Sequence, residues 1–159
     1  MAKRAAAFDC RVLYHNRSKR SDADFAEYFA SLDEMLPLCD FVCVVVALTA
    51  ETRHMFKYEH FCKMKKTSIF CNVSRGDTVD QDGLVKALNE NQIHMAALDV
   101  TSPEPLPRDH PLLKCSNCII VPHWGSATDT TRLGMVKMAI ENTLQALNNE
   151  SKLTSEVFE

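Results

Sequence analysis

Hydrophobic residues in this 159-residue chain fall into short apolar blocks separated by helix-like stretches and polar turns. Continuous apolar blocks are typical of strands in a parallel sheet, which are buried on both faces, and residues 41–47 are the clearest example. Strands are predicted at residues 11–14, 41–47, 68–73, 95–100 and 118–121. Because helical patterns alternate with these blocks, we expect an α/β fold with a parallel sheet.

Apolar residues with helical spacing fill the intervals between the predicted strands. Helices are expected at residues 2–8, where the last turns of a helix are predicted, and at 32–38, 58–63, 81–89 and 128–147. Ser31 is placed to cap the second of these helices. The last helix carries an apolar stripe that indicates core or interface packing. The stripe consists of Leu133, Val136, Ile140, Leu144 and Leu147.

A helix followed by a strand at the start of the chain implies a strand before that helix. In a Rossmann unit such a strand leads into the phosphate-binding loop G-x-G-x-x-G. The first glycine here is Gly76, so the motif is absent from these residues. The sequence therefore predicts a truncated doubly wound parallel sheet, Rossmann-like, without its first strand and glycine-rich loop.

Composition narrows the class of protein. Hydrophobic residues make up 46% of the chain and the formal net charge is −3, which gives no electrostatic reason to expect nucleic acid or a membrane surface as a partner. The longest apolar run, residues 41–48, is too short to cross a bilayer, and the start of the chain lacks the apolar region of a signal peptide. We expect a cytoplasmic protein.

Seven cysteines are scattered through the apolar segments. An odd count without an export signal favours free, buried thiols. Cys115 and Cys118 have C-x-x-C spacing, but no second pair completes a zinc site and the histidines show no ligand spacing. We expect no metal ion.

Three polar residues with complementary chemistry follow the ends of predicted strands. Arg75, Glu104 and His123 each come just after an apolar block. If these strands are parallel neighbours, the three side chains converge on one edge of the sheet, where they could bind a carboxylate and move a proton. Taken singly, they could equally be a surface ion-pairing residue, a solvated loop residue and a strand-end hydrogen bonder.

The blocks that carry these residues resemble a known family. Residues 70–77, 96–105 and 121–128, with the spacing between them, are similar to the C-terminal half of the D-2-hydroxyacid dehydrogenases. The segment 101–107 looks most like the members that reduce glyoxylate and hydroxypyruvate. The resemblance covers nearly the whole chain, whereas the family's enzymes are much longer.

The resemblance implies roles for individual residues. Arg75 would bind the substrate carboxylate, His123 would act as general acid and base, and Glu104 would stabilise its imidazolium and fix its tautomer. The implied cofactor-binding residues are Arg17, Thr49, Val73, Asp99 and Gly125. Arg17 would hold the 2′-phosphate of NADP, with NAD as the weaker alternative; a solvated basic turn is the other interpretation. Thr49 could equally be a plain helix cap.

The resemblance also implies an activity and an organisation. The activity is NADPH-dependent reduction of a small 2-oxo acid, glyoxylate or hydroxypyruvate, to the D-2-hydroxy acid, in an enzyme family that forms homodimers. Residues 1–147 would be a partial NAD(P)-binding Rossmann domain, and residues 148–159 a tail returning to a substrate domain that these residues lack. The alternative hypothesis is a non-catalytic fragment or isoform, at most an interaction module.

Overall fold

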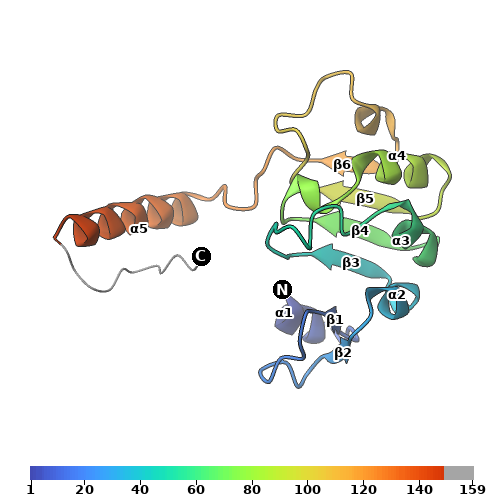
Figure 1. Ribbon diagram of the computed structural model, residues 1–159, viewed down its shortest axis with the longest axis horizontal. Helices are drawn as coiled ribbons and strands as arrows, with labels where there is room; N and C mark the ends of the chain where they lie inside the picture. Colours follow the sequence, from blue (N-terminus) through green and yellow to red (C-terminus); the bar gives the residue numbers. More distant parts are fainter. Residues whose placement is uncertain (149–159) are drawn as a thin grey trace. The chain divides into compact units, whose positions relative to one another are not determined.

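The computed structural model of the protein describes residues 1–148. The chain divides into two units, Met1–Pro122 and a second unit that begins at His123. The first unit contains the sheets and the shorter helices, and the second contains one long helix (Figure 1).

A four-stranded parallel sheet forms the centre of the first unit (Figure 1). Its strands are β3 (Phe41–Val44), β4 (Ile69–Asn72), β5 (Met95–Leu98) and β6 (Cys118–Ile120), in that order across the sheet. The last residue of each strand is in register with the last residue of its neighbour. All four following loops therefore begin at one edge, and the four strands predicted in this part of the chain are confirmed.

Three helices of the first unit share the hydrophobic core with one face of this sheet. They are α2 (Leu32–Met35), α3 (Tyr58–Lys63) and α4 (Gln81–Asn89). Phe70 of β4 meets Phe56 and Phe61 edge to face, with ring centroids 5.1 Å apart in both pairs. At Gly83, a Cβ would lie 2.9 Å from the backbone nitrogen of Tyr58, so glycine allows α4 to approach the start of α3 closely.

The opposite face of the sheet is open at β3. Val42 and Val44 are buried, whereas Phe41 is 68% exposed and Cys43 is also exposed. The prediction that residues 41–47 form a strand buried on both faces was therefore wrong. The strand alternates because helices of its own unit pack on only one of its faces, and it ends at Val44.

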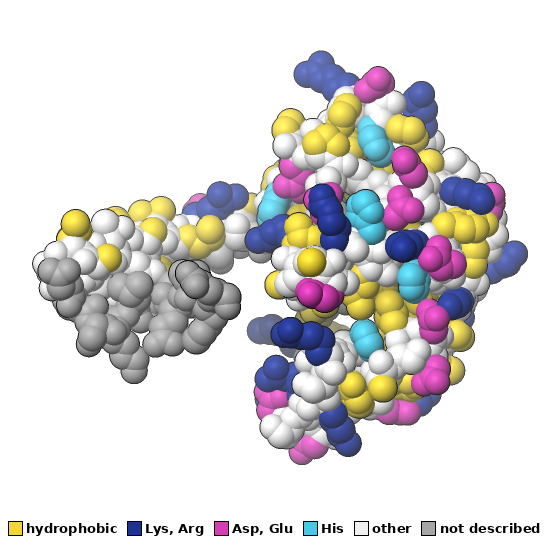
Figure 2. Space-filling model, viewed as in Figure 1, with side chains coloured by type: hydrophobic (Ala, Val, Ile, Leu, Met, Phe, Trp, Pro, Cys, Tyr) yellow, Lys and Arg dark blue, Asp and Glu magenta, His cyan; other side chains and the backbone are white. Residues whose placement is uncertain are grey.

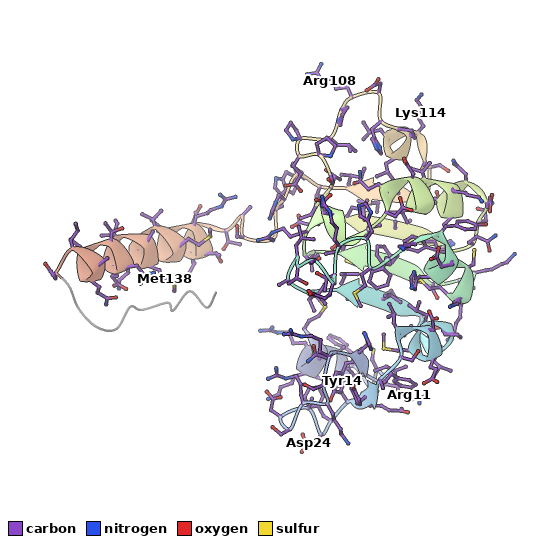
Figure 3. The ribbon with its side chains drawn as sticks, in the orientation of Figure 1. Arg11, Tyr14, Asp24, Arg108, Lys114 and Met138 are labelled. Carbon is purple, nitrogen blue, oxygen red and sulfur yellow. The ribbon has the colours of Figure 1, made fainter. Side chains whose placement is uncertain are left out.

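A second, two-stranded parallel sheet lies near the start of the chain, after α1 (Ala2–Ala6). The predicted strand β1 (Leu13–His15) pairs with β2 (Glu27–Phe29), which the sequence did not predict, and not with the four-stranded sheet. The rings of Tyr14 and Tyr28 are tilted by 50°, with centroids 5.4 Å apart, and Arg11 forms a 2.5 Å ion pair with Glu27. Figure 3 labels Tyr14 and Arg11.

The helices begin and end close to their predicted bounds, with two differences. The helix expected at 32–38 divides into α2 and a 3-10 turn, Leu36–Leu38, because Pro37 has no N–H for an α-helical bond. Ser31 precedes α2, but its side chain makes no capping hydrogen bond, so its predicted capping role was wrong.

The second unit contains α5 (Asp129–Leu147), as the helical spacing predicted. The Thr128 hydroxyl accepts a 3.3 Å hydrogen bond from the Thr131 N–H and caps the helix. The apolar stripe from Leu133 to Leu147 is exposed, so it forms no core in this unit, and its packing at an interface stays a prediction. The predicted tail lies outside the described residues after Asn148.

The cysteines are free, but not all are buried. Cys39 and Cys115 are buried, whereas Cys10, Cys43 and Cys62 are exposed. The prediction of buried thiols fails for these three because they lie in a loop, on the open face of β3 and on the outer side of α3.

In Figure 2, acidic and basic side chains are interspersed over the visible face of the first unit. Within residues 1–148, no helix is both long enough and apolar enough to span a membrane.

Candidate functional site

The carboxyl edge of the four-stranded sheet holds most of the predicted site residues. Thr49 follows β3, Val73 and Arg75 follow β4, and Asp99 and Glu104 follow β5. In open parallel α/β sheets, ligands bind at this edge. The geometry of each loop therefore decides which side chains are available to a ligand.

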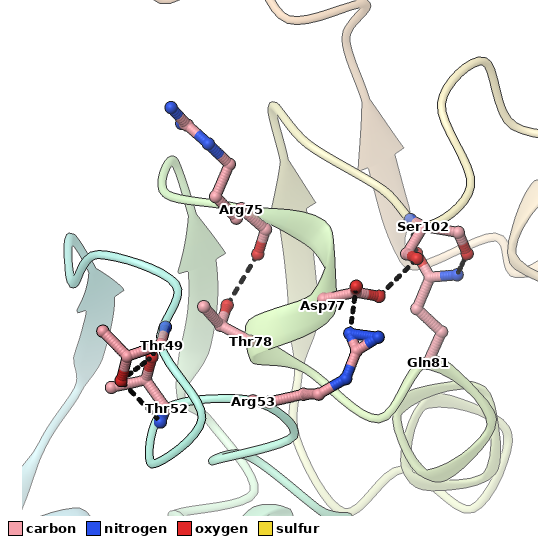
Figure 4. Close-up of polar contacts among 8 residues, drawn as sticks. All are labelled: Thr49, Thr52, Arg53, Arg75, Asp77, Thr78, Gln81 and Ser102. Atoms are coloured by element: carbon pink, nitrogen blue, oxygen red, sulfur yellow. Dashed lines mark hydrogen bonds and ion pairs between the residues drawn. The ribbon is translucent and has the colours of Figure 1, made fainter.

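A buried polar network shapes the turn that carries Arg75. The Asn72 amide donates to the Arg75 carbonyl at 3.0 Å and to the Thr78 hydroxyl at 3.2 Å, and its oxygen accepts from the Ser74 N–H and hydroxyl. Thr78 donates a second hydrogen bond, 2.7 Å, to the Arg75 carbonyl. These bonds fix the backbone of Arg75, and its exposed guanidinium donates a 2.7 Å hydrogen bond to the Ser74 carbonyl while pointing away from Thr78 (Figure 4).

Gly76 brings this turn against the loop that carries Glu104. A Cβ at position 76 would lie 2.0 Å from the Thr101 carbonyl oxygen and 2.6 Å from the Ser102 nitrogen. No real side chain fits at such distances, so the loops after β4 and β5 touch through their backbones. Arg75 and Glu104 are consequently carried by two loops in direct contact.

Side-chain bonds reinforce that contact (Figure 4). The Asp77 carboxylate accepts hydrogen bonds from the Ser102 hydroxyl and the Arg53 guanidinium. The bond from Ser102, together with the positive charge of Arg53, lowers the pKa of Asp77. The Gln81 amide accepts from the Ser102 N–H at 2.9 Å and donates to the Ser102 carbonyl.

Glu104 is held by its own loop. Its carboxylate accepts a 2.9 Å hydrogen bond from the Thr101 N–H, and the Thr101 hydroxyl donates to the Pro103 carbonyl at 3.0 Å. Glu104 is exposed, yet this bond turns its carboxylate back toward the end of β5. The carboxylate of Glu104 is therefore oriented by its own loop, and its catalytic role stays a prediction.

Asp99 and Val73 come directly after β5 and β4. Asp99 is buried to 8% exposure, and its N–H donates to the Asn72 carbonyl at 2.9 Å. Val73 is 39% exposed, and its N–H donates to the Val44 carbonyl at 3.3 Å. An acceptor and an apolar surface thus lie on neighbouring strands of the same edge.

Thr49 closes a turn and caps no helix, which corrects one of the two interpretations of this residue. Its N–H donates to the Thr52 hydroxyl at 2.8 Å, and its carbonyl accepts from the Arg53 N–H. The Thr49 hydroxyl donates to Glu51 at 2.6 Å and lowers the pKa of that carboxyl group.

Arg17 lies within electrostatic reach of this turn. Its positive charge makes a smaller contribution to the lowered pKa of Glu51. Nearby, Arg20 donates two hydrogen bonds to Asp22, at 2.8 and 2.9 Å, so its charge is neutralised locally. Arg17 remains the exposed cation that best suits an anionic group arriving beside the Thr49 turn.

His123 and Gly125 belong to the second unit. His123 has a φ of 52°, in the left-handed region that costs a non-glycine residue about 1–3 kcal/mol and that is over-represented at functional sites. Gly125 lies in a turn in which the Trp124 carbonyl accepts from the Ala127 N–H at 2.9 Å. Because the two residues lie outside the first unit, the convergence of His123 with Arg75 and Glu104 stays a prediction.

Sequence reasoning missed the residues that hold the loops: Asn72, Asp77, Thr78, Gln81 and Ser102. Their partners depend on which loop residues meet across the sheet edge, and a single sequence does not show this. The one available signal was the density of hydrogen-bonding side chains between residues 72 and 81. Among residues 1–148, no cluster of three or more acidic, histidine or cysteine side chains is arranged to hold a metal ion.

These features define a dinucleotide-binding α/β domain, and the comparisons with known proteins agree. Residues 1–125 match the family described as D-isomer specific 2-hydroxyacid dehydrogenase, NAD binding domain, and the chain belongs to this family. Glyoxylate/hydroxypyruvate reductase B of Cronobacter sakazakii is 44% identical over 153 residues, which are 94% of this chain and 47% of that protein. The chain spans about half the length of the curated relatives it matches.

Solved structures show the same similarity. The NADPH-dependent glyoxylate/hydroxypyruvate reductase of Sinorhizobium meliloti, in complex with NADP and malonate, has a TM-score of 0.90 at 31% identity and is matched over 98% of this chain and 48% of that one. A glyoxylate reductase from Paecilomyes thermophila has a TM-score of 0.88 at 33% identity, over 98% and 47% of the two chains.

The residues present fit the two ends of a nicotinamide dinucleotide. Asp99 is a buried carboxylate and Val73 an exposed apolar side chain, which suit a nicotinamide, and Arg17 is an exposed cation, which suits a phosphorylated ribose. A pyrophosphate needs a glycine-rich turn at a helix N-terminus, and no glycine precedes Gly76. The 159 residues therefore contain candidates for the two ends of a cofactor site and no glycine-rich turn for its centre.

Proposed function

We propose that this chain is the cofactor-binding and acid–base half of an NADP-dependent D-2-hydroxyacid dehydrogenase that reduces glyoxylate or hydroxypyruvate to the D-2-hydroxy acid. The observation that carries the proposal is the interlock at Gly76, which joins the loops of Arg75 and Glu104 at the carboxyl edge of a parallel sheet. Family membership and the names of the relatives support it.

Each proposed catalytic residue has a defined task. The exposed Arg75 guanidinium binds the substrate carboxylate through paired, charge-assisted hydrogen bonds. His123 donates a proton to the carbonyl oxygen as the oxygen gains charge, and Glu104 holds the imidazolium in position. A bound nicotinamide supplies the hydride.

The proposed cofactor is NADP. Arg17 meets the 2′-phosphate, and the exposed Thr49 turn and Gly125 lie along the cofactor. Asp99 accepts a hydrogen bond from the carboxamide, and Val73 contacts the ring. NAD is the weaker alternative, because a cation at the ribose favours the additional phosphate.

The proposal extends to the partners and the cellular location of the enzyme. The substrate is a small 2-oxo acid, the complete enzyme is a cytoplasmic homodimer, and neither nucleic acid nor membrane is a partner. The interspersed surface charges support the last point.

A second candidate applies to the 159 residues on their own. Without a glycine before Gly76, they have no pyrophosphate cradle, so they act as a non-catalytic module. The two candidates predict different activities for a chimera that adds the remaining segments of a longer relative.

A chimera separates them. Residues 1–148 replace the matching segment of the Sinorhizobium meliloti reductase, which contributes its own remaining segments, and NADPH-dependent glyoxylate reduction is measured. The chimera should turn over, and the isolated chain should stay well below about 1 s⁻¹, near the low end of ordinary enzymes. An inactive but folded chimera would contradict the proposed activity.

Cofactor preference gives the second arm of the test. Arg17→Asp in the chimera should reverse the preference for NADPH over NADH in kcat/KM, because a carboxylate repels the 2′-phosphate and suits the 2′-hydroxyl. Lys19→Asp makes the same charge change two residues away and should leave the preference in place. If Arg17→Asp alters the ratio by less than about twofold, Arg17 is only a surface charge.

A further inference from the structure

Cys43 and Cys71 lie opposite each other on the two neighbouring strands β3 and β4. They are Cα partners in the parallel register, so their side chains point to the same face of the sheet. Paired strands lie about 4.8 Å apart, and a disulfide accepts Cα separations of about 4.4–6.8 Å. The Cα separation of the pair therefore falls within the range that a disulfide accepts.

The pair is accessible and its two members differ. Cys43 is exposed, on the open face of β3, and Cys71 is half-buried. A hydrogen bond from Cys71 lowers the pKa of the Cys43 thiol to about 7. The interaction with Cys43, together with burial and the negative charge of Asp99, raises the pKa of Cys71.

These differences assign an order of reaction. The lowered pKa keeps more of Cys43 as thiolate at neutral pH than an ordinary cysteine, and the thiolate is the attacking species. Cys71 stays protonated and adjacent, which suits the second thiol, the one that resolves a mixed disulfide.

The other close pair lacks these properties. Cys115 and Cys118 have C-x-x-C spacing, but burial raises the pKa of both thiols, to about 12 for Cys118. Cys115 is also buried and donates to the Pro111 carbonyl at 3.6 Å.

We propose that Cys43 and Cys71 form a thiol–disulfide exchange site, which small-molecule disulfides of the glutathione type oxidise to a cross-strand disulfide. The Cys43 thiolate attacks the small disulfide RSSR, forms a mixed disulfide and releases one RS⁻, which takes up the proton lost by Cys43. The Cys71 sulfur then attacks the Cys43 sulfur and releases a second thiolate, which takes up the Cys71 proton. Two protein thiols are oxidised and one RSSR is reduced to two RSH.

The proposed exchange site does not depend on the proposed enzymatic function, although both use residues on or just after β3 and β4. The new bond links β3 to β4, whose following loops carry Thr49 and Arg75. Oxidation would therefore fasten together the two strands from which these loops start.

Peptide mapping tests the proposal on the 159-residue chain. The folded protein is incubated with oxidised glutathione at pH 7, blocked with iodoacetamide and cut with trypsin without reduction. Cys43 lies in the tryptic peptide 21–53 and Cys71 in the peptide 67–75. We expect these two peptides to be linked, with fragment ions placing the bond at Cys43 and not at Cys39 of the same peptide, and dithiothreitol should reverse the link.

Three variants separate the roles. Cys43→Ser should slow the release of glutathione roughly tenfold, since the most ionised thiol is lost. Cys71→Ser should stop the reaction at a glutathione adduct on Cys43. Cys62→Ser removes another exposed thiol and should leave the linked peptides unchanged.

Wild-type mapping decides the question even if a variant does not fold. Separate glutathione adducts on Cys43 and Cys71 with no link between them would overturn the proposal. So would a link that appears only in urea, or one that joins other cysteines equally well.

Discussion

Asn72 is the side chain that ties the sheet to the Arg75 turn. It is 1% exposed, and its amide group makes four hydrogen bonds, to the carbonyl of Arg75 and to groups of Ser74 and Thr78. No buried side-chain polar atom in the described part of the chain is left without a partner. Because every partner of Asn72 is itself positioned by it, the network behaves as one unit.

Asn72→Ala should therefore lower the free energy of unfolding by about 3 kcal/mol, since buried groups of Ser74 and Thr78 lose their partner. Urea unfolding followed by circular dichroism measures this change. Thr67 is an exposed residue just before β4, and Thr67→Ala should leave the free energy of unfolding within about 0.5 kcal/mol of the wild-type value. Equal effects of the two substitutions would mean that the network adds nothing to stability.

Asp77 gives a pH-dependent contribution at the residue scale. The Ser102 hydroxyl and Arg53 lower its pKa in the folded protein below the ordinary 3.8, so protonation favours the unfolded chain. Its stabilising effect is present above pH 3.8 and disappears as the pH falls through the lower folded value. Asp77→Asn should destabilise the protein at pH 7, and the difference from the wild type should shrink toward pH 3.

Asp24→Asn is the control for this titration. Asp24 is an exposed aspartate in the loop before β2 (Figure 3). Its substitution should cause no comparable difference in urea unfolding at either pH. If the difference in the free energy of unfolding between Asp77→Asn and the wild type were unchanged at pH 3, the stabilising role of the ionised Asp77 carboxylate would be contradicted.

The residues that were predicted and those that were missed differ in a physical way. Arg75 and Glu104 were identified because they stand in short motifs at strand ends, and the structure puts their loops in contact. Asn72 and Gln81 were missed because the sequence does not show whether an amide side chain is solvated or hydrogen-bonded in the interior. Those partners come from loop packing across the sheet edge.

At the scale of elements, the strands of the four-stranded sheet were predictable and their surroundings were not. Strands β3 to β6 could be predicted because strands of parallel sheets are usually continuous runs of apolar residues. Strand β2 was not predicted because Glu27–Phe29 is short and begins with a charged residue. The exposure of one face of β3 was not predicted because the burial of a strand depends on which helices of the unit pack on each of its faces.

Glycine substitutions test how these elements meet. Gly76→Ala should destabilise the protein by about 3 kcal/mol, because the new methyl group would collide with the Thr101 backbone, which cannot rotate away. Gly134→Ala is the matched control, since a Cβ there meets nothing within 4 Å and lies inside α5. It should stabilise the helix by about 0.5–1 kcal/mol.

Thermal and urea unfolding of both variants, measured side by side, check this prediction. Opposite signs support a backbone contact between the loops after β4 and β5. A neutral Gly76→Ala would mean that the two loops separate at little cost, and that Arg75 and Glu104 are not held together.

At the scale of the whole molecule, the predicted catalytic residues are distributed over the two units. The first unit contributes Arg75 and Glu104 from interlocked loops, and the second begins with His123 in a left-handed conformation. The chain spans about half the length of its curated relatives, so the proposed reaction is tested in the chimera that adds the other segments from a longer relative.

The most direct measurement is the turnover of His123→Gln in that chimera. Glutamine keeps a polar side chain but cannot donate a titrating proton, so kcat for glyoxylate reduction should fall by roughly 10²–10⁴-fold while NADPH binding is retained. His94→Gln, which changes an exposed histidine just before β5, should leave kcat unchanged. A His123→Gln chimera with near-normal kcat would contradict the assignment of His123 as the proton donor.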